Sequence, residues 1–255
     1  MRSLLVKYAQ ATMRYHDLPG NGVPVMFIHG LGCASSCDFP RIAADPELAG
    51  RRMLLVDLLG SGFSDRPDNF GYAVDDHARS LCELIDTLQV ATVDVVGHSM
   101  GGSIAIVLAA WNRAKIRRLV VSEPNLDPGG GSFSKPIAEQ NESDYVLRGH
   151  DRAVERARAE GNSIWAGSLM TSSPLAVHRG ALSLVRGSSP SWRELLRELQ
   201  MPRTVLFGGR SLPDPDAERL PRFGIAVRVV EDAGHSMIWE NPSGYARAVR
   251  ESLEG

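Results

Sequence analysis

The sequence predicts an α/β fold in which a mostly parallel central sheet is flanked by helices and carries an inserted helical segment. Short apolar runs rich in β-branched residues, typical of strands buried on both faces, alternate with segments whose apolar residues recur at helical spacing. This alternation stops near residue 125 and resumes near residue 201. The hydrophobic share of 43% and the charged share of 23% are ordinary for a globular domain, so 255 residues can bury one large core.

Each predicted element of the first half has a local signal. The segment 7–16 alternates loosely and leads into a turn cluster at 17–22, which indicates edge strands and a hairpin. Buried strands are expected at 24–28, 53–56, 93–97 and 119–122. Helices are expected at 72–88 and 102–111. Strands that alternate with helices in this way form a parallel sheet with right-handed crossovers.

The segment after residue 125 has a different character. A glycine-rich connector, Pro128–Ser132, is followed by helical patterns and by no clear strand. The helical patterns occupy 151–160, 162–170 and 174–185. Ser191 with Glu194 three residues later forms a capping box, which predicts that another helix begins there.

The second half of the core follows this insertion. Strand patterns return at 204–208 and 227–230, and a closing helix is expected at 242–253. We therefore expect an α/β core formed by residues 1–124 and 201–255, and a helical cap, or lid, formed by residues 125–200.

Charge and cysteine content exclude several classes of partner. A net charge of −2 provides no field that would attract nucleic acid or an anionic membrane. No apolar run approaches the length of a membrane span, and the first ten residues lack the pattern of a signal peptide. The three cysteines form neither a metal-ligand group nor a disulfide framework. We expect a cytoplasmic enzyme without a bound metal.

The pattern G-x-S-x-G occurs where an apolar strand run ends and an apolar helical run begins. A strand that turns directly into a helix strains the residue at the corner, and its neighbours pass too close together for any Cβ. Gly97 and Gly101 remove that clash, so Ser99 can project its hydroxyl beyond the sheet edge. The helix then directs free N–H groups and a positive dipole end toward the same point. The pattern predicts a nucleophilic serine.

A serine nucleophile needs a base, and the base needs an orienting group. His235 lies between a predicted strand and the closing helix, in a loop expected at the same sheet edge as Ser99, so it is the predicted general base. Leu31, Asp57 and Glu123 also follow predicted strands, and ligands collect at these carboxyl ends of parallel strands.

The remaining histidines considered receive no catalytic role. His98 neighbours Ser99 but is expected to point the opposite way and to pack. His29 is expected to hold its glycine loop through ring hydrogen bonds. His150 and His178 fall within the predicted cap and are expected to face solvent.

The order of these motifs resembles that of the α/β-hydrolase family, and the resemblance covers the whole chain. The motifs that carry it are His29-Gly30, Asp57-x-x-Gly60-x-Gly62-x-Ser64, Gly97-His98-Ser99-Met100-Gly101-Gly102 and Gly234-His235. The resemblance implies an oxyanion hole formed by the backbone N–H groups of Leu31 and Met100. It also implies that Asp57 belongs to a structural turn and is not catalytic.

The acid of the expected triad departs from the usual family pattern. Most similar enzymes carry an Asp three residues beyond the glycine that ends the strand 204–208, and this chain has Ser211 there. Some members, certain dehalogenases and lactone hydrolases among them, place the acid after the strand that follows the nucleophile helix. That position is Glu123 here. We therefore expect Glu123 to be the acid, with Asp214, reached by a longer loop, as the alternative.

Together these residues predict a cofactor-free serine hydrolase that cleaves a small hydrophobic carboxylic ester or lactone through an acyl-enzyme on Ser99. Apolar residues of the cap are expected to form the pocket, namely Phe133, Trp165, Leu169 and Met170.

Two other functions stay open. A C–C bond hydrolase of a vinylogous diketone would use the same triad, although such enzymes more often carry Asn in place of His98. A ligand-binding or signalling protein on a hydrolase fold would show little turnover. A haloalkane dehalogenase is disfavoured because its nucleophile would be an Asp, where this chain has Ser99.

Overall fold

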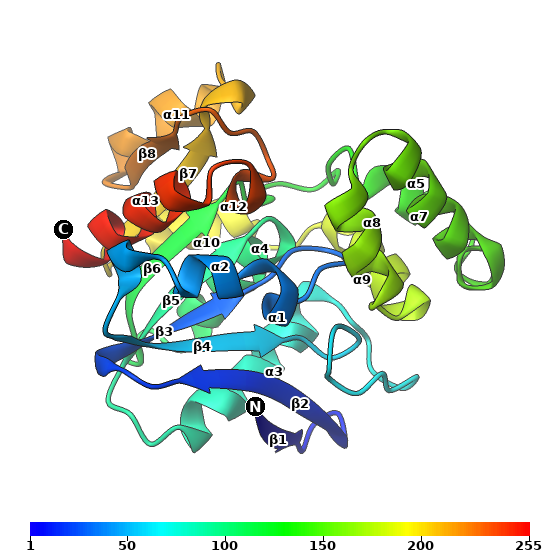
Figure 1. Ribbon diagram of the computed structural model, residues 1–255, viewed down its shortest axis with the longest axis horizontal. Coiled ribbons are helices and arrows are strands. Elements are labelled where there is room, and N and C mark those ends of the chain that lie inside the picture. Colours follow the sequence, from blue (N-terminus) through cyan, green and yellow to red (C-terminus); the bar gives the residue numbers. More distant parts are fainter.

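An eight-stranded sheet crosses the whole molecule in the computed structural model, which describes residues 1–255 (Figure 1). The strand order is β1-β2-β4-β3-β5-β6-β7-β8. The strands are β1 Arg2–Val6, β2 Ala11–Leu18, β3 Asn21–Ile28, β4 Arg51–Asp57, β5 Val93–His98, β6 Ile116–Ser122, β7 Arg203–Gly208 and β8 Ala226–Val230. All pairs from β4 to β8 are parallel, which confirms the predicted α/β fold.

The two edge strands β1 and β2 are antiparallel to their neighbours, as expected for the start of the chain. The hairpin lies elsewhere than predicted. Residues 7–10 turn β1 into β2, whereas the cluster at 17–22 connects β2 to β3, and these two strands lie on either side of β4. A turn cluster marks a change of direction but does not show which strands then pair.

Helices cover both faces of the sheet. The helices of the whole chain are α1 Ser35–Asp38, α2 Pro40–Ala43, α3 Val74–Thr87, α4 Met100–Trp111, α5 Lys135–Ala138, α6 Glu142–Asp144, α7 His150–Ala159, α8 Ser163–Met170, α9 Pro174–Arg186, α10 Trp192–Glu198, α11 Pro215–Arg219, α12 Met237–Glu240 and α13 Pro242–Glu254. The short 3-10 or π segments are η1 Pro46–Leu48, η2 Tyr145–Gly149, η3 Gly209–Ser211 and η4 Leu220–Phe223. None of the helices is long and apolar enough to cross a membrane. The cytoplasmic location stays a prediction.

Two apolar cores lie on opposite faces of the sheet because successive strand side chains alternate between them. Met26 and Ile28 of β3 enter the larger core, which includes α3, α4 and α10. Val25 and Phe27 of the same strand enter the smaller core, which includes α2, α12 and α13. Residues of one continuous apolar run are therefore all buried, which is why this run predicts a strand covered on both faces.

The segment 125–200 forms helices without a strand, as its pattern predicts. Helices α5, α7, α8 and α9 project together to one side of the sheet in Figure 1. Helix α10 packs instead against α4, and its first turn carries the predicted capping box, in which the Ser191 N–H donates to Glu194 at 2.7 Å. The division into a core and a cap at residues 125 and 200 stays a prediction.

His150 and His178 are buried, so the expectation that they face solvent is wrong. His150 is hydrogen-bonded to the Leu169 carbonyl at 3.0 Å and to the Tyr145 hydroxyl at 3.1 Å. His178 is hydrogen-bonded to the Gln140 carbonyl at 2.8 Å. The His150 ring joins α7 to α8, and the His178 ring joins α9 to the turn between α5 and α6. These contacts depend on tertiary packing and have no local sequence signal.

Candidate active site

Ser99 stands at the corner between β5 and α4 in a strained backbone conformation, with φ 54° and ψ −122°. A Cβ at Gly97 would lie 2.3 Å from the Gly101 carbonyl oxygen, and one at Gly101 would lie 2.3 Å from the Ile28 carbonyl oxygen. Only glycine fits at these two close approaches. The glycines of the motif thus allow the tight strand-to-helix turn that holds Ser99 at the sheet edge.

Three side chains from three separate segments form a hydrogen-bonded chain. The Ser99 hydroxyl lies 3.2 Å from His235 Nε2, and His235 Nδ1 lies 2.8 Å from Glu123 Oε2. Glu123 directly follows β6, and His235 lies in the loop between β8 and α12. All three residues follow strands at one edge of the sheet, where the carboxyl ends of the parallel strands meet.

Glu123 is held by more than the histidine. The Gly208 N–H donates to its Oε1 at 3.0 Å, and the Ser211 hydroxyl also forms a hydrogen bond with the carboxylate. Burial alone would raise the pKa of Glu123, but the hydrogen bonds from His235, Ser211 and Gly208 outweigh burial and lower this pKa to about 2. The carboxylate therefore stays ionised at neutral pH.

Asp214, the alternative acid, lies at the N-terminus of α11. Its side chain accepts a hydrogen bond from the Asp216 N–H at 2.7 Å and caps that helix. Glu123 is the carboxylate that His235 contacts.

The backbone N–H groups of Leu31 and Met100 lie beside this site. Met100 is the first residue of α4, where N–H groups lack an intrahelical acceptor. The Leu31 N–H has no acceptor within the chain. The loop before Leu31 is fixed by His29, whose ring is hydrogen-bonded to the Gly30 carbonyl at 2.8 Å and to the Leu58 N–H at 3.1 Å.

His98 is buried beside His235, with 5.0 Å between the two ring centroids. It lines the cavity together with Ser99, so the expectation that it points the opposite way is wrong. Its Nδ1 is hydrogen-bonded to the Ser122 hydroxyl at 3.1 Å, and that hydroxyl lies 3.3 Å from the Tyr245 hydroxyl. Burial, and then the neighbouring His235, lower the pKa of His98 to about 3. The ring is therefore neutral, as suits a packing partner of His235.

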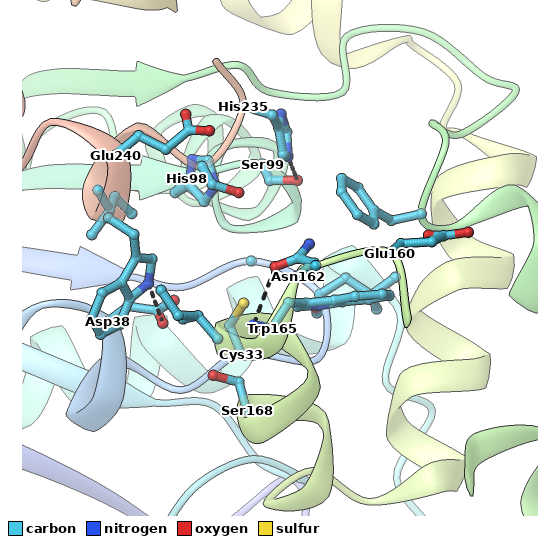
Figure 2. A pocket seen from close by; sticks show the side chains of 18 residues that line it. Cys33, Asp38, His98, Ser99, Glu160, Asn162, Trp165, Ser168, His235 and Glu240 are labelled. Carbon is cyan, nitrogen blue, oxygen red and sulfur yellow. Dashed lines mark hydrogen bonds between the residues drawn. The ribbon is translucent and has the colours of Figure 1, made fainter. Parts of the chain in front are cut away.

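A cavity of about 420 Å³ opens over the Ser99 hydroxyl (Figure 2). Its lining consists of Gly30, Leu31, Cys33, Asp38, His98, Ser99, Phe133, Glu160, Gly161, Asn162, Ile164, Trp165, Ser168, His235, Ser236, Ile238, Trp239 and Glu240. Seven of these 18 residues are hydrophobic, and most of the surface that the wall exposes to the cavity is apolar.

The four predicted pocket residues divide into two pairs. Phe133 and Trp165 line the cavity, and their rings pack edge to face with 4.9 Å between centroids. Leu169 is fully buried and does not line the cavity, and Met170 is 62% exposed on the surface. The prediction is wrong for these two because α8 is apolar on nearly all sides, so its sequence does not show which face turns inward.

Sequence reasoning missed the part of the wall formed by Cys33 and Asp38 and by Trp239 and Glu240. Cys33 and Asp38 follow the glycine loop that bears Leu31, and Trp239 and Glu240 follow His235. Their position just after two functional strand ends was an available signal, because such loops gather at one sheet edge.

Residues 23–186 match the family model described as alpha/beta hydrolase fold, and the chain belongs to that family. The family confirms the resemblance that the motifs indicate.

One curated relative matches this chain in sequence over part of its length. The 2-hydroxymuconate semialdehyde hydrolase of Pseudomonas sp. (strain CF600) is 37% identical over 125 residues, covering 49% of this chain and 42% of the relative. The chain thus spans less than half the length of this curated relative.

Two solved structures have the same fold over nearly the full chain. An esterase from Exiguobacterium antarcticum has a TM-score of 0.80 and 18% identity, with 96% of each chain covered. The enol-lactonase from Burkholderia xenovorans LB400 has a TM-score of 0.80 and 20% identity, with 100% of each chain covered.

Proposed function

We propose that the protein is a serine hydrolase that cleaves a small carboxylic ester or lactone through an acyl-enzyme on Ser99, without a cofactor. The observation that carries this proposal is the chain from Ser99 Oγ through His235 to Glu123, with distances of 3.2 Å and 2.8 Å. A hydroxyl, an imidazole and an ionised carboxylate in this order are the parts that nucleophilic acyl transfer needs.

In the proposed reaction, Ser99 Oγ attacks the carbonyl carbon while His235 Nε2 accepts the hydroxyl proton. The resulting imidazolium is stabilised by Glu123 and returns the proton to the alcohol that leaves. A water molecule then attacks the acyl-enzyme, again with His235 as base, and releases the carboxylic acid and the free Ser99 hydroxyl.

The tetrahedral intermediates carry a negatively charged oxygen. The N–H groups of Leu31 and Met100 are free at this edge of the sheet and are assigned to that oxygen. One such donor commonly contributes roughly 3 kcal/mol to transition-state stabilisation. The dipole of α4 adds to it, because the helix begins at Met100.

C–C bond hydrolysis of a vinylogous diketone is the second candidate. The observation that favours it is the similarity to the semialdehyde hydrolase of Pseudomonas, which is 37% identical over 125 residues of this chain. The same Ser99, His235 and Glu123 would serve this reaction. A ligand-binding protein with little turnover is the third candidate, and the hydrogen-bonded triad argues against it.

The test of the first proposal is hydrolysis of p-nitrophenyl butyrate and a panel of lactones by the wild type and by Ser99→Ala. Ser99→Ala is expected to lower kcat by a factor on the order of 10⁶. A fluorophosphonate probe is expected to label the wild type at Ser99 and to leave the variant unlabelled. Absence of both turnover and labelling in the wild type would refute the serine hydrolase.

The two enzymatic candidates are distinguished by comparing the kcat/KM values of their substrates on the same enzyme. A ring-cleavage dienoate, whose visible absorbance disappears on C–C cleavage, is assayed beside the esters with the same enzyme. A kcat/KM for the dienoate at least tenfold above that of every ester and lactone would show that the second candidate is the right one.

A further inference from the structure

Apart from two histidines, the titratable oxygen and nitrogen groups that line the cavity wall are all acidic. Three carboxyl side chains line it, from Asp38, Glu160 and Glu240, and no lysine or arginine does. Figure 2 shows Asp38 and Glu240 on one side of the cavity and Glu160 on the other. The electrostatic contribution of each carboxylate depends on whether a cation already neutralises it.

Two of these carboxylates are paired. Glu240 lies 2.9 Å from the Arg210 guanidinium and accepts the Gly234 N–H at 2.6 Å. Glu160 lies 2.8 Å from Arg156, and both of these side chains are more than half exposed. Solvent and the two arginines therefore screen both glutamates.

Asp38 differs from them in burial and in partners. It ends α1 with 3% of its surface exposed, and it takes part in no ion pair. The Trp239 indole N–H donates to its Oδ1 at 3.3 Å, and the Cys33 thiol also hydrogen-bonds to it. Burial raises the pKa of this carboxyl to about 7, against the effect of those two hydrogen bonds. An uncompensated acid thus borders the cavity that contains Ser99.

We propose that Asp38 is a specificity-determining residue that selects substrates bearing a positively charged ammonium group and rejects substrates bearing a carboxylate. The inference rests on the proposed serine hydrolase function and adds a substrate class to it. A cation in the cavity would meet the buried carboxylate on one side. The aromatic rings of Trp239, Trp165 and Phe133 also line the cavity and can stabilise a cation through their faces.

A carboxylate in the same place would face a like charge, and no lysine or arginine lines the wall to bind it. A muconate semialdehyde, the substrate named for the Pseudomonas relative, carries such a carboxylate. The charge of the wall therefore favours ester hydrolysis over the C–C reaction for this chain.

The test uses three p-nitrophenyl esters with the same spacing between the ester carbonyl and the end group. One ends in a quaternary ammonium (4-(trimethylammonio)butanoate), one in a tert-butyl group (5,5-dimethylhexanoate) and one in a carboxylate (the glutarate monoester). The measured quantity is the ratio of kcat/KM for the ammonium ester to that for the glutarate ester, at pH 8, above the pKa of about 7 of the Asp38 carboxyl. The neutral ester is the internal reference.

In the wild type, this ratio is expected to exceed roughly tenfold, which corresponds to about 1.4 kcal/mol. In Asp38→Asn it is expected to fall to within about threefold of unity, because the variant keeps the shape and loses the charge. Asp38→Ser, which also lacks the charge, serves if the first variant folds poorly. Glu160→Gln is the matched control and is expected to change the ratio by less than about twofold.

A wild-type ratio at or below unity would overturn the proposal, as would a ratio that Asp38→Asn leaves unchanged while the neutral ester is hydrolysed. Binding of the same esters to Ser99→Ala, measured by calorimetry, separates this inference from the proposed function. If the wild type hydrolyses none of the three, but Ser99→Ala binds the ammonium ester more tightly than the glutarate ester, charge selection holds and the hydrolase proposal fails. Equal binding together with no turnover would refute both.

Discussion

At the scale of single residues, Glu123 is the unusual member of the proposed triad. It takes up a positive φ of 40° immediately after β6, and its carboxylate reaches both His235 and the Gly208 N–H of the neighbouring strand β7. Ser211, at the position where the family usually carries an acid, hydrogen-bonds to this carboxylate. In the proposed triad the acid thus follows the adjacent strand, and Ser211 stands at the position where the family usually carries the acid.

Glu123→Gln is expected to lower kcat by a factor on the order of 10⁴, because an amide can neither fix the required His235 tautomer nor stabilise the imidazolium. The measurement is steady-state hydrolysis of p-nitrophenyl butyrate. Asp214→Asn is the matched control and should stay within about threefold of the wild type, since asparagine is an equally good helix N-cap. A collapse in Asp214→Asn with normal activity in Glu123→Gln would show that the acid is misassigned.

At the scale of elements, helix α8 is attached to the loop that carries Leu31. The Trp165 indole N–H donates to the Leu31 carbonyl at 2.9 Å, and a Cβ at Gly32 would lie 2.5 Å from Leu169. This loop bears one of the two N–H groups assigned to the oxyanion. The docking of an inserted helix therefore fixes a part of the proposed catalytic machinery.

Trp165→Phe is expected to lower kcat/KM about three- to tenfold, because the ring still lines the cavity but no longer holds the Leu31 carbonyl, a loss of roughly 1 kcal/mol. The fall should appear in kcat more than in KM, since the oxyanion forms only in the transition state. Phe133→Leu, which removes a ring from the same wall and no hydrogen bond, is the comparison. An effect of Trp165→Phe on KM alone would contradict the loop-holding role.

At the scale of the whole molecule, buried neutral histidines link stability to pH. Burial lowers the pKa of His77 to about 3, helped by the nearby His29, and it lowers the pKa of His98 to about 3 as well. In the unfolded chain, such rings bind a proton as pH falls through about 6.5. Between these values the unfolded state binds more protons than the folded state, so the free energy of unfolding falls as pH falls.

Each of these rings is expected to remove about 2 kcal/mol of stability between pH 7.5 and pH 5. His77→Leu is therefore expected to reduce the drop in Tm over this range by about 4 to 8 °C. Differential scanning fluorimetry at the two pH values measures it. His16→Leu, in the partly exposed strand β2, is the control, and an equal reduction there would remove the case for His77.

The sequence by itself determined the parts of this protein that depend on the order of residues within short segments. Alternating strand and helix patterns predict the parallel sheet, because strands buried on both faces need continuous apolar runs. The glycines around Ser99 predict the strained corner, because no other residue fits there. His235 and Glu123 are predicted to lie near Ser99 because both follow strands that end at the same edge, and the choice of Glu123 as the acid comes from the resemblance to the α/β-hydrolase family.

Only the tertiary structure decided what surrounds these residues. The inward face of α8, the burial of His150 and the position of Asp38 in the cavity wall depend on how separate segments dock. Docking is set by the packing of side chains distant in sequence, which leaves no periodic signal in any one segment. Local motifs thus predict the residues of the proposed nucleophilic attack. The charge that we propose selects the substrate belongs to Asp38 of α1, which meets Trp239 of α12 only in the folded chain.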